Sequence, residues 1–469
     1  MNKIVIAVVA VIAVILLAVP RALGSLTETR VRERVAALSS NGVLSLEVKS
    51  YDRGWFHSTA KIEVGVAPAY LAQMGAAGAA AADAARHATI AVDFAHGPVM
   101  VQRGLRFGLS SMVAKLDPST PGIEALEKQL GVPYLFEFRG HTGFGGAVAF
   151  DADVPPLDVP AGPAQFKFSG ATLDGTYAGE RLVSNARIDS FEFVSPGGTF
   201  ALRNLRAKTD NTFQSPYVAP GEAELTIESV SALDPVQGAT PALQADHLRI
   251  ASTASTNDAH TLLDMRVTYD LDRVHAVDTE LSGAALGIAM HNVDVEALTH
   301  YVTTVRELGA NATPPDPQTL LAALGTDIER ALAAGPGLTI DPIRFTLDGE
   351  PFEGRVELTT NPSRLPPGGV AAIDPATLLS LVNSQANVRL SKPLARRLAA
   401  LGVESQLGGD PRMPRDQLKY LAEAQAGLTL VTLVNQGFLV EDGDVYTAAL
   451  SFADGSLTLN GNPLPLGLQ

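Results

Sequence analysis

The chain contains no cysteine among its 469 residues. This absence excludes disulfide bonds, thiolate metal sites, cysteine nucleophiles and a lipid-modified N-terminal cysteine. It does not exclude an oxidising compartment, because a chain of this length buries enough apolar surface to fold without cross-links. The chain also has a single tryptophan, Trp55, which marks one defined place in the fold.

The chain has fewer basic than acidic residues. Lys and Arg number 35 against 50 Asp and Glu, which gives a formal net charge of −15. Nucleic-acid binding needs a dense positive field, so we expect no nucleic-acid partner. The basic residues Arg30, Arg32 and Arg34 form one local exception. We interpret them as a solvated helix face rather than a contact with lipid headgroups.

Contiguous catalytic and cofactor motifs are missing as well. The sequence has no Gly-x-Ser-x-Gly elbow, no His-Glu-x-x-His metal motif and no complete dinucleotide fingerprint. None of the nine histidines pairs with another at the spacing of helical metal ligands. We therefore predict no cofactor, no metal and no enzymatic activity. A hydrolase with a dispersed site stays open, because catalytic triads assemble in space rather than in sequence.

An apolar run is present at residues 4–19, preceded by Lys3 and followed by Pro20 and Arg21. A membrane-spanning helix needs about 20 apolar residues, so residues 1–23 are predicted to form an N-terminal membrane anchor. The positive-inside tendency keeps Lys3 on the side of synthesis. This predicts a single-pass protein of the bacterial inner membrane with the bulk of the chain in the periplasm. The alternative is a cleaved signal peptide ending near Gly24.

The remaining chain alternates between strand and helix patterns. Apolar residues alternate with polar ones in two strands that predict a hairpin over residues 44–66, and similar alternation continues to about residue 290. Helical periodicity follows near 295–308, 318–334, 375–386, 392–401 and 414–426. The predicted fold class is α+β, a long twisted antiparallel sheet system with helices packed on one side, plus the N-terminal transmembrane helix. We divide the chain into a β-rich region, 24–290, and a mixed region, 291–469, which form either one body or two similar halves.

An aromatic segment joins the two strands of the predicted hairpin. Its candidate interaction residues are Tyr51, Arg53, Gly54, Trp55 and Phe56. One hypothesis is a docking site, in which Trp55 and Phe56 anchor a partner, because Trp and Arg are frequent interface hot spots. The other hypothesis, which we favour, is a turn that tucks Trp55 into the core with Gly54 at a positive φ.

A second candidate feature is the sequence His96, Gly97 and Pro98 at the end of a predicted strand. Glycine and proline together are typical of a turn, and a turn is the interpretation that we favour. The alternative hypothesis is a histidine that exchanges protons.

These motifs together resemble a known family. The segment at residues 51–60, the turn at 96–98 and the sequence GSLTLNG at 455–461 are similar to the YdgA-like family of uncharacterised Gram-negative envelope proteins. The resemblance implies an inner-membrane anchor and a large periplasmic body, and it brings no assigned activity. A more distant similarity to AsmA-like envelope proteins implies long sheets suited to lipid handling, which is an analogy of fold only.

The functional prediction is a non-enzymatic, membrane-anchored periplasmic protein that binds a lipid, a glycan or another envelope protein. This hypothesis predicts an apolar groove on the folded body. The alternative is a scaffold or assembly partner of other envelope proteins, which binds through edge strands or through helices of the second half.

Overall fold

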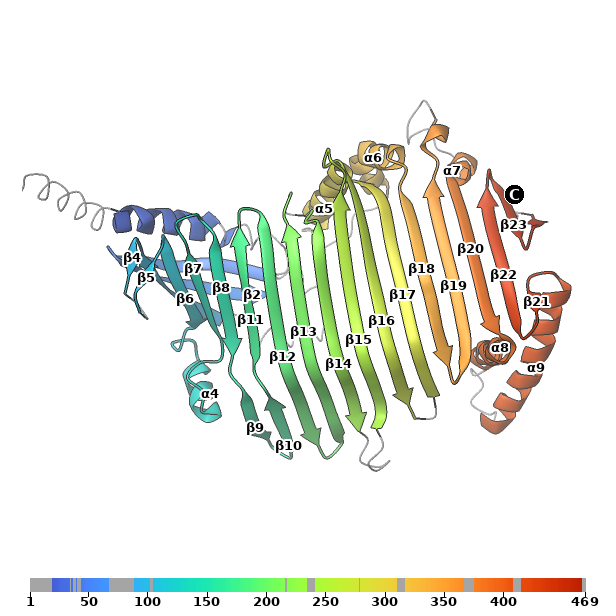
Figure 1. Cartoon of the computed structure of the whole chain (residues 1–469), viewed down its shortest axis with the longest axis horizontal. Coiled ribbons are helices and arrows are strands. Elements are labelled where there is room, and N and C mark those ends of the chain that lie inside the picture. The colour runs from blue at the N-terminus through green and yellow to red at the C-terminus, as the bar shows by residue number, and fades with distance from the viewer. Residues whose placement is uncertain are drawn as a thin grey trace, which may run out of the picture. The chain divides into compact units, whose positions relative to one another are not determined.

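The computed structural model describes residues 19–33, 35–36, 39, 44–66, 88–101, 104–215, 217–233, 241–277, 279–309, 317–366, 375–407 and 415–465, most of them in antiparallel strands (Figure 1). The chain divides into two compact units. Unit 1 comprises Met1–Pro196, Arg203–Tyr217 and Thr303–Leu320. Unit 2 comprises Gly197–Leu202, Val218–Val302 and Leu321–Gln469. Strand β13 (Gly198–Thr212) contributes residues to both.

Unit 1 contains an antiparallel sheet in which most strands pair with their neighbours in sequence. The pairing order begins β1 (Leu44–Arg53), β2 (His57–Val66), β3 (Ala88–His96), β6 (Ser110–Leu116), β7 (Glu137–Thr142) and β8 (Val148–Val154). It continues through β11 (Ala171–Ala178) to β12 (Arg181–Ser195). A small hairpin, β4 (Val99–Met100) with β5 (Arg106–Phe107), and helix α4 (Ile123–Leu130) also belong to this unit.

Two adjacent strands of this sheet are interrupted at the same level. β8 gives way to β9 (Leu157–Ala161) at a pair of prolines, and β10 (Ala164–Phe168) gives way to β11 at Gly170. β9 pairs with β10, and β10 pairs with the last part of β12. Proline cannot donate a ladder hydrogen bond, and Gly170 has a φ of 89°, so both residue types suit a break in pairing.

Unit 2 contains a second run of antiparallel strands. β14 (Gly221–Leu233), β15 (Pro241–Thr256), β16 (Leu262–Ala276), β17 (Thr279–Asp294), β18 (Gly337–Leu347) and β19 (Glu350–Thr360) pair in sequence order. β20 (Val382–Ser391) and β22 (Val445–Ala453) follow. β22 also pairs with β21 (Val440–Asp442) and β23 (Ser456–Leu459), and β23 pairs with β24 (Asn462–Leu464).

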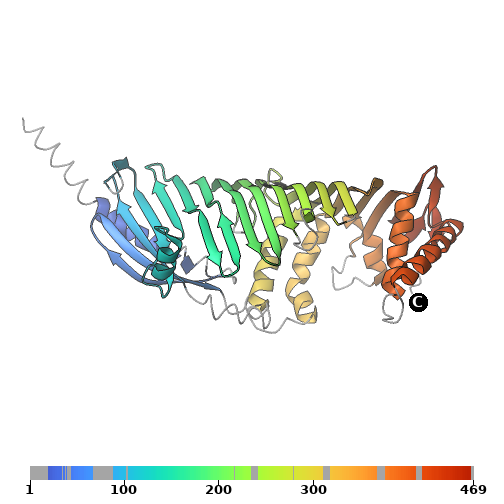
Figure 2. The same ribbon diagram turned by 90° about the horizontal axis from the view of Figure 1, so that it is seen from below.

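The other elements are helical. They are α5 (Val295–Gly309), α6 (Pro317–Ala333), a 3-10 turn (Pro362–Arg364), α7 (Pro375–Leu381), α8 (Lys392–Leu407) and α9 (Arg415–Asn435). Helix α8 packs on β19, β20 and β22, and α8 and α9 lie together on one side of the unit 2 sheet (Figure 2). The buried cluster between them contains Ala395, Leu430 and Tyr446.

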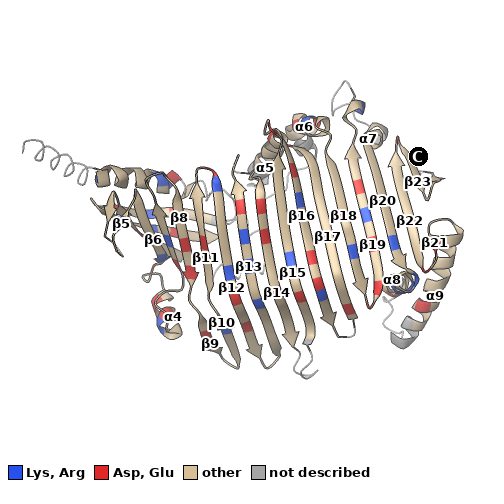
Figure 3. Ribbon diagram, in the orientation of Figure 1, with Lys and Arg blue, Asp and Glu red and all other residues tan. Residues whose placement is uncertain are grey.

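The unit 2 sheet has one apolar and one charged face. Four apolar residues stand opposite one another across adjacent strands: Ile250, Tyr269, Leu286 and Ile343. The neighbouring row, one residue along each strand, is Arg249, Asp270, Ala285 and Arg344. Successive side chains of a strand point to opposite faces, so the first row belongs to the apolar face and the second to the charged face. Figure 3 shows the charged residues spread along these strands.

The predicted α+β class is wrong, because strands dominate the described residues and the molecule is mainly an antiparallel sheet. Most helices lie near their predicted positions, but the helix predicted over 375–386 ends at Leu381, and the residues after it form β20. The strands are longer than their sequence signals. β16 has 15 residues, whereas clear alternation covers only its centre, from Met265 to Leu271. Beyond that centre, the adjacent Leu262 and Leu263 and the adjacent Asp272 and Arg273 break the alternation, although backbone pairing continues.

The predicted membrane anchor is also corrected. No helix in the described part of the chain is long and apolar enough to cross a membrane, which contradicts the predicted single-pass helix and the inner-membrane location derived from it. Residues 4–18 of the apolar run lie outside the described residues. Residues 19–33 are helical, but they include Arg21, Glu28 and Arg32, and the helix packs on the sheet of unit 1.

Candidate functional site

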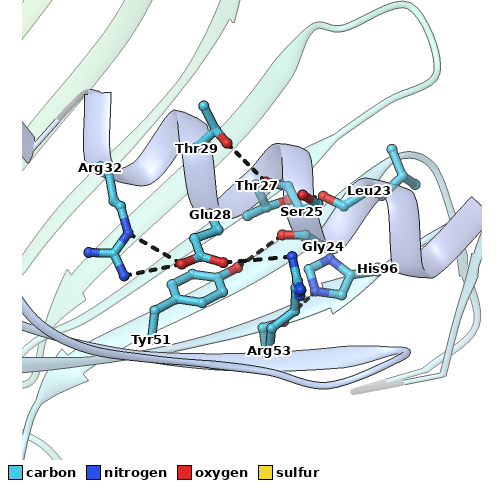
Figure 4. A network of polar contacts seen from close by, with 11 residues as sticks. Leu23, Gly24, Ser25, Thr27, Glu28, Thr29, Arg32, Tyr51, Arg53 and His96 are labelled. Atoms are coloured by element: carbon cyan, nitrogen blue, oxygen red, sulfur yellow. Dashed lines mark hydrogen bonds and ion pairs between the residues drawn. The ribbon is translucent and has the colours of Figure 1, made fainter.

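The two motifs predicted from sequence meet in unit 1, beneath the helical residues 19–33 (Figure 4). The amide of His96 donates to the carbonyl of Phe56 at 2.8 Å, which joins the two motifs directly. The hydroxyl of Tyr51 donates to the carbonyl of Gly24 at 3.5 Å. Arg53 lies 4.0 Å from the carboxylate of Glu28. The helix thus covers the ends of β1 and β3, the two strands that pair with β2 on either side.

A serine–histidine pair lies at the centre of this place. The Ser58 Oγ is 2.8 Å from the His96 Nε2, and both residues are 1% exposed. The His96 Nδ1 has no hydrogen-bond partner among the described residues. Burial lowers the pKa of His96 below its ordinary value, and the nearby His57 lowers it further. His96 is therefore held as a neutral ring.

This pair does not provide an accessible nucleophile. A β-carbon added at Gly24 would stand only 3.1 Å from the His96 Nε2, so the helix backbone closes over the ring. A serine hydrolase also needs a carboxylate that orients the histidine, and the Nδ1 of His96 meets none in the described part of the chain. The pair is a buried structural hydrogen bond.

β3 ends at His96 and a bend follows at Gly97 and Pro98, where the sequence predicts a turn. Gly97 is required by close packing. A β-carbon there would lie 1.7 Å from the carbonyl oxygen of Gly108. The amide of Gly97 also donates to the carbonyl of Leu109 at 2.8 Å, which fixes the turn against the next segment.

The aromatic segment differs from the core interpretation that the sequence favoured. Trp55 is 46% exposed and Phe56 is 50% exposed, so Trp55 is not tucked into the core. The guanidinium of Arg21 lies 5.1 Å from the Trp55 ring centroid. Gly54 is not among the residues with positive φ. Its added β-carbon would instead be 2.2 Å from the carbonyl oxygen of His57. The docking hypothesis for this segment stays a prediction.

A larger cavity lies in unit 2 between α8 and α9, and we name it the α8–α9 groove. Its volume is about 910 Å³, which is within the usual range for small-molecule sites. Its basic wall is formed by Lys392, Arg396 and Arg397 of α8. Its apolar lining includes Leu401, Leu430 and Tyr446. The groove can therefore contact a negative group and an apolar group at once.

Two of these three cations are already engaged. The ammonium of Lys392 lies 3.5 Å from the carboxylate of Glu441 and 5.4 Å from the Tyr446 ring. Arg397 pairs with Asp348. The amide of Glu280 and Arg397 together lower the pKa of Asp348 below its usual range. Arg396 makes no ion pair with any residue that the structure describes.

The charged face of unit 2 has a second cavity of about 500 Å³ that includes Arg344, Arg355 and Arg389. Acidic residues balance these cations. Arg355 lies 3.0 Å from Glu357, and Arg389 lies 3.6 Å from Asp442. Arg344 is exposed and has the carboxylate-bearing Glu353 opposite it on β19. This alternation of signs is typical of a solvated sheet face.

The described part of the chain contains no cluster of three His, Asp or Glu residues close enough together to hold a metal ion. Sequence reasoning singled out none of the groove residues. One signal was available, because Lys392, Arg396 and Arg397 all fall within the first two turns of α8. That signal cannot reveal which cation lacks a partner, since Asp348 and Glu441 come from distant segments.

Comparison with family models identifies the family of the chain. A family model described as a bacterial protein of unknown function (DUF945) matches residues 1–467. No curated protein and no solved structure matches the chain.

Proposed function

The chain belongs to the DUF945 family of bacterial proteins of unknown function, and we propose that it is a non-enzymatic protein that binds a lipid-like amphiphile. The proposed binding surface is the apolar face of the unit 2 sheet. The observation that carries the proposal is the exposure of large apolar side chains on that face. Tyr269 is 41% exposed, Met290 40% and Leu358 36%.

These three side chains belong to one face by register. Tyr269 stands opposite Leu286 on β17, and Met290 follows on the same face of β17 four residues later. Met290 stands opposite Leu338, which in turn stands opposite Leu358 on β19. Contiguous apolar surface of this kind is uncommon on soluble proteins and frequently marks an interaction site.

Binding of an apolar ligand to this face is favourable, because it removes both the apolar side chains of the sheet and the ligand's own chain from water. Each buried methylene contributes about 0.8 kcal/mol. Association itself costs at least about 4 kcal/mol in lost motional freedom. An acyl chain of eight or more carbons therefore suits the face, whereas a glycan, whose surface is mostly polar, does not gain enough by the same mechanism.

A protein partner is the second candidate function. It is favoured by one observation on α9, where Leu421, Leu428 and Val431 are exposed. Their spacing of seven and three residues places them on one side of the helix. Such a stripe suits a scaffold or assembly role, in which another protein covers the helix.

The proposal is tested with the full chain and N-phenyl-1-naphthylamine, an uncharged probe that fluoresces in apolar surroundings. We expect saturable binding and displacement by decanol. The variant Leu358→Glu should weaken probe binding at least tenfold. The matched control is Thr359→Glu, which places the same charge one residue along β19 on the charged face. Equal probe affinity in the two variants would contradict the proposal, and absence of displacement by decanol would favour the protein partner.

We also propose the finer placement of the chain with the YdgA-like proteins. It is supported by residues 51–60 and 455–461, which carry the resemblance. In a YdgA-like protein, substitution of the residues that match Arg53 and Trp55 should change the protease sensitivity of the same segment as in this chain. Limited proteolysis that shows changes in unrelated segments would oppose the placement.

A further inference from the structure

We propose that the α8–α9 groove binds the anionic headgroup of the amphiphile, with Arg396 as the residue that contacts the charge. This inference rests on the proposed function and adds a second site and a ligand class. The headgroup carries a carboxylate or a phosphate with a single negative charge. Both groups accept paired hydrogen bonds from the planar guanidinium of an arginine.

The groove adjoins the apolar face of the sheet. Tyr446 lines the groove, and it stands opposite Leu390, which stands opposite Phe352 and then Phe345 across β20, β19 and β18. These four residues form one cross-strand row. Ile343 lies two residues before Phe345 on β18 and therefore points to the same side. A ligand with its headgroup in the groove has its chain on the apolar side of the sheet, beside Leu390 and Phe352.

Arg396 is the cation left for a ligand. Lys392 is held by Glu441 at 3.5 Å, and Arg397 is held by Asp348. Arg396 lines the same cavity without an ion-pair partner in the described part of the chain. An incoming anion can pair with Arg396 without breaking either existing pair, and the two neighbouring cations raise the local potential that attracts it.

The start of α8 strengthens this interpretation. Helix N-termini favour acidic residues, because the helix dipole is positive there. The first turn of α8 has no acidic residue and begins with Lys392. The side chain of Ser391 satisfies one helix amide, accepting from the Leu394 N–H at 3.2 Å. Several positive charges near a positive helix end disfavour the helix on its own, and a bound anion relieves that repulsion.

Two carboxylates set a limit on the headgroup. Glu404 and Glu423 also line the groove. Glu404 follows Arg396 by eight residues, which places it about 12 Å further along the helix axis at 1.5 Å per residue. A compact group with one negative charge fits near Arg396, whereas an extended polyanion meets Glu404. The groove therefore favours fatty-acid or phosphodiester headgroups over multiply phosphorylated ones.

The test compares amphiphiles that differ only in charge. In the full chain, decanoate should displace N-phenyl-1-naphthylamine about tenfold more tightly than decanol does. Arg396→Gln should remove that difference and leave the affinity for decanol unchanged, while Arg396→Lys should retain part of it. Arg344→Gln is the matched control, since it removes an exposed arginine from the opposite face. Displacement of the probe by lysophosphatidylglycerol is measured in the same way. Its affinity, compared with that of decanoate, distinguishes a phospholipid ligand from a free fatty acid.

The outcomes separate the two proposals. If decanol and decanoate bind equally well to the unaltered chain, or if Arg396→Gln leaves their ratio unchanged, the headgroup site is wrong and the apolar-face proposal stands. If neither compound displaces the probe, the proposed function itself fails. A ratio that falls in Arg396→Gln but not in Arg344→Gln supports the inference.

Discussion

Ser58 and His96, which lie 38 residues apart in the sequence, form a 2.8 Å hydrogen bond inside unit 1, and both side chains are almost fully removed from solvent. The bond joins β2 to the end of β3 beneath the N-terminal helix. A buried polar atom without a partner is destabilising, and the His96 Nδ1 already has none among the described residues. The remaining bond at Nε2 is therefore important for stability.

We expect Ser58→Ala to lower the free energy of unfolding by about 1–3 kcal/mol, because it leaves the His96 Nε2 buried without a partner. The measurement is urea unfolding of the full chain, followed by circular dichroism. Thr59→Ala is the control, since Thr59 is exposed on the next residue of β2. If both substitutions have the same effect, the hydrogen bond does not contribute as we argue.

The stability of unit 1 should fall at mildly acidic pH. The pKa of His96 is lowered in the folded chain from its ordinary value of 6.5, mainly by burial. Below pH 6.5 the unfolded chain takes up a proton at this residue more readily than the folded chain. The contribution is therefore complete above pH 6.5 and is lost as the pH falls towards the lower folded value.

The pH effect is measured by urea unfolding at pH 7.5 and pH 5.5. His96→Gln should reduce the difference between the two conditions, whereas His291→Gln, which alters an exposed histidine on β17, should not. An unchanged difference in His96→Gln would show that other groups cause the pH dependence.

Arg139 on β7 should stabilise unit 1 through several carboxylates at once. It lies 3.3 Å from Glu137, 2.5 Å from Asp151 and 2.6 Å from Asp153. Glu137 is buried, and the hydroxyl of Tyr134 donates to Asp153, a bond that raises the pKa of Tyr134 to about 12. Removing the cation leaves these negative charges close together.

We expect Arg139→Gln to lower the free energy of unfolding by about 1–3 kcal/mol, less than for a fully buried pair because Arg139 is partly exposed. The control is Arg181→Gln, whose pair with Asp210 is solvent-exposed and should contribute less to stability. Thermal unfolding at low and high salt gives the comparison. A larger loss in Arg181→Gln than in Arg139→Gln would refute the ranking.

Local elements were the most predictable part of the fold. The hairpin of β1 and β2 follows from alternation between residues 44 and 66, and it is confirmed. Asn460 and Gly461, a residue pair typical of hairpin turns, form the turn between β23 and β24. Both residues have positive φ, as an Asn-Gly hairpin turn requires. In these cases neighbouring residues contain the whole signal.

The candidate sites were harder to predict because they depend on distant contacts. Trp55 is exposed although its segment reads as a core turn. The backbone of the helix above it closes over Tyr51 and His96, whereas the Trp55 ring meets the helix through the side chain of Arg21. Arg396 and Arg397 are adjacent and chemically identical in the sequence. Only the position of Asp348, on the turn between β18 and β19, distinguishes the engaged arginine from the other.

The sequential pairing of strands from β14 to β17 has a consequence for folding. Each of these strands contacts the one that follows it in the chain, so every step of assembly closes a short loop. Low separation between contacting residues favours rapid folding. The sheet can grow by adding one hairpin arm at a time, and an end strand can detach without requiring the interior strands to separate.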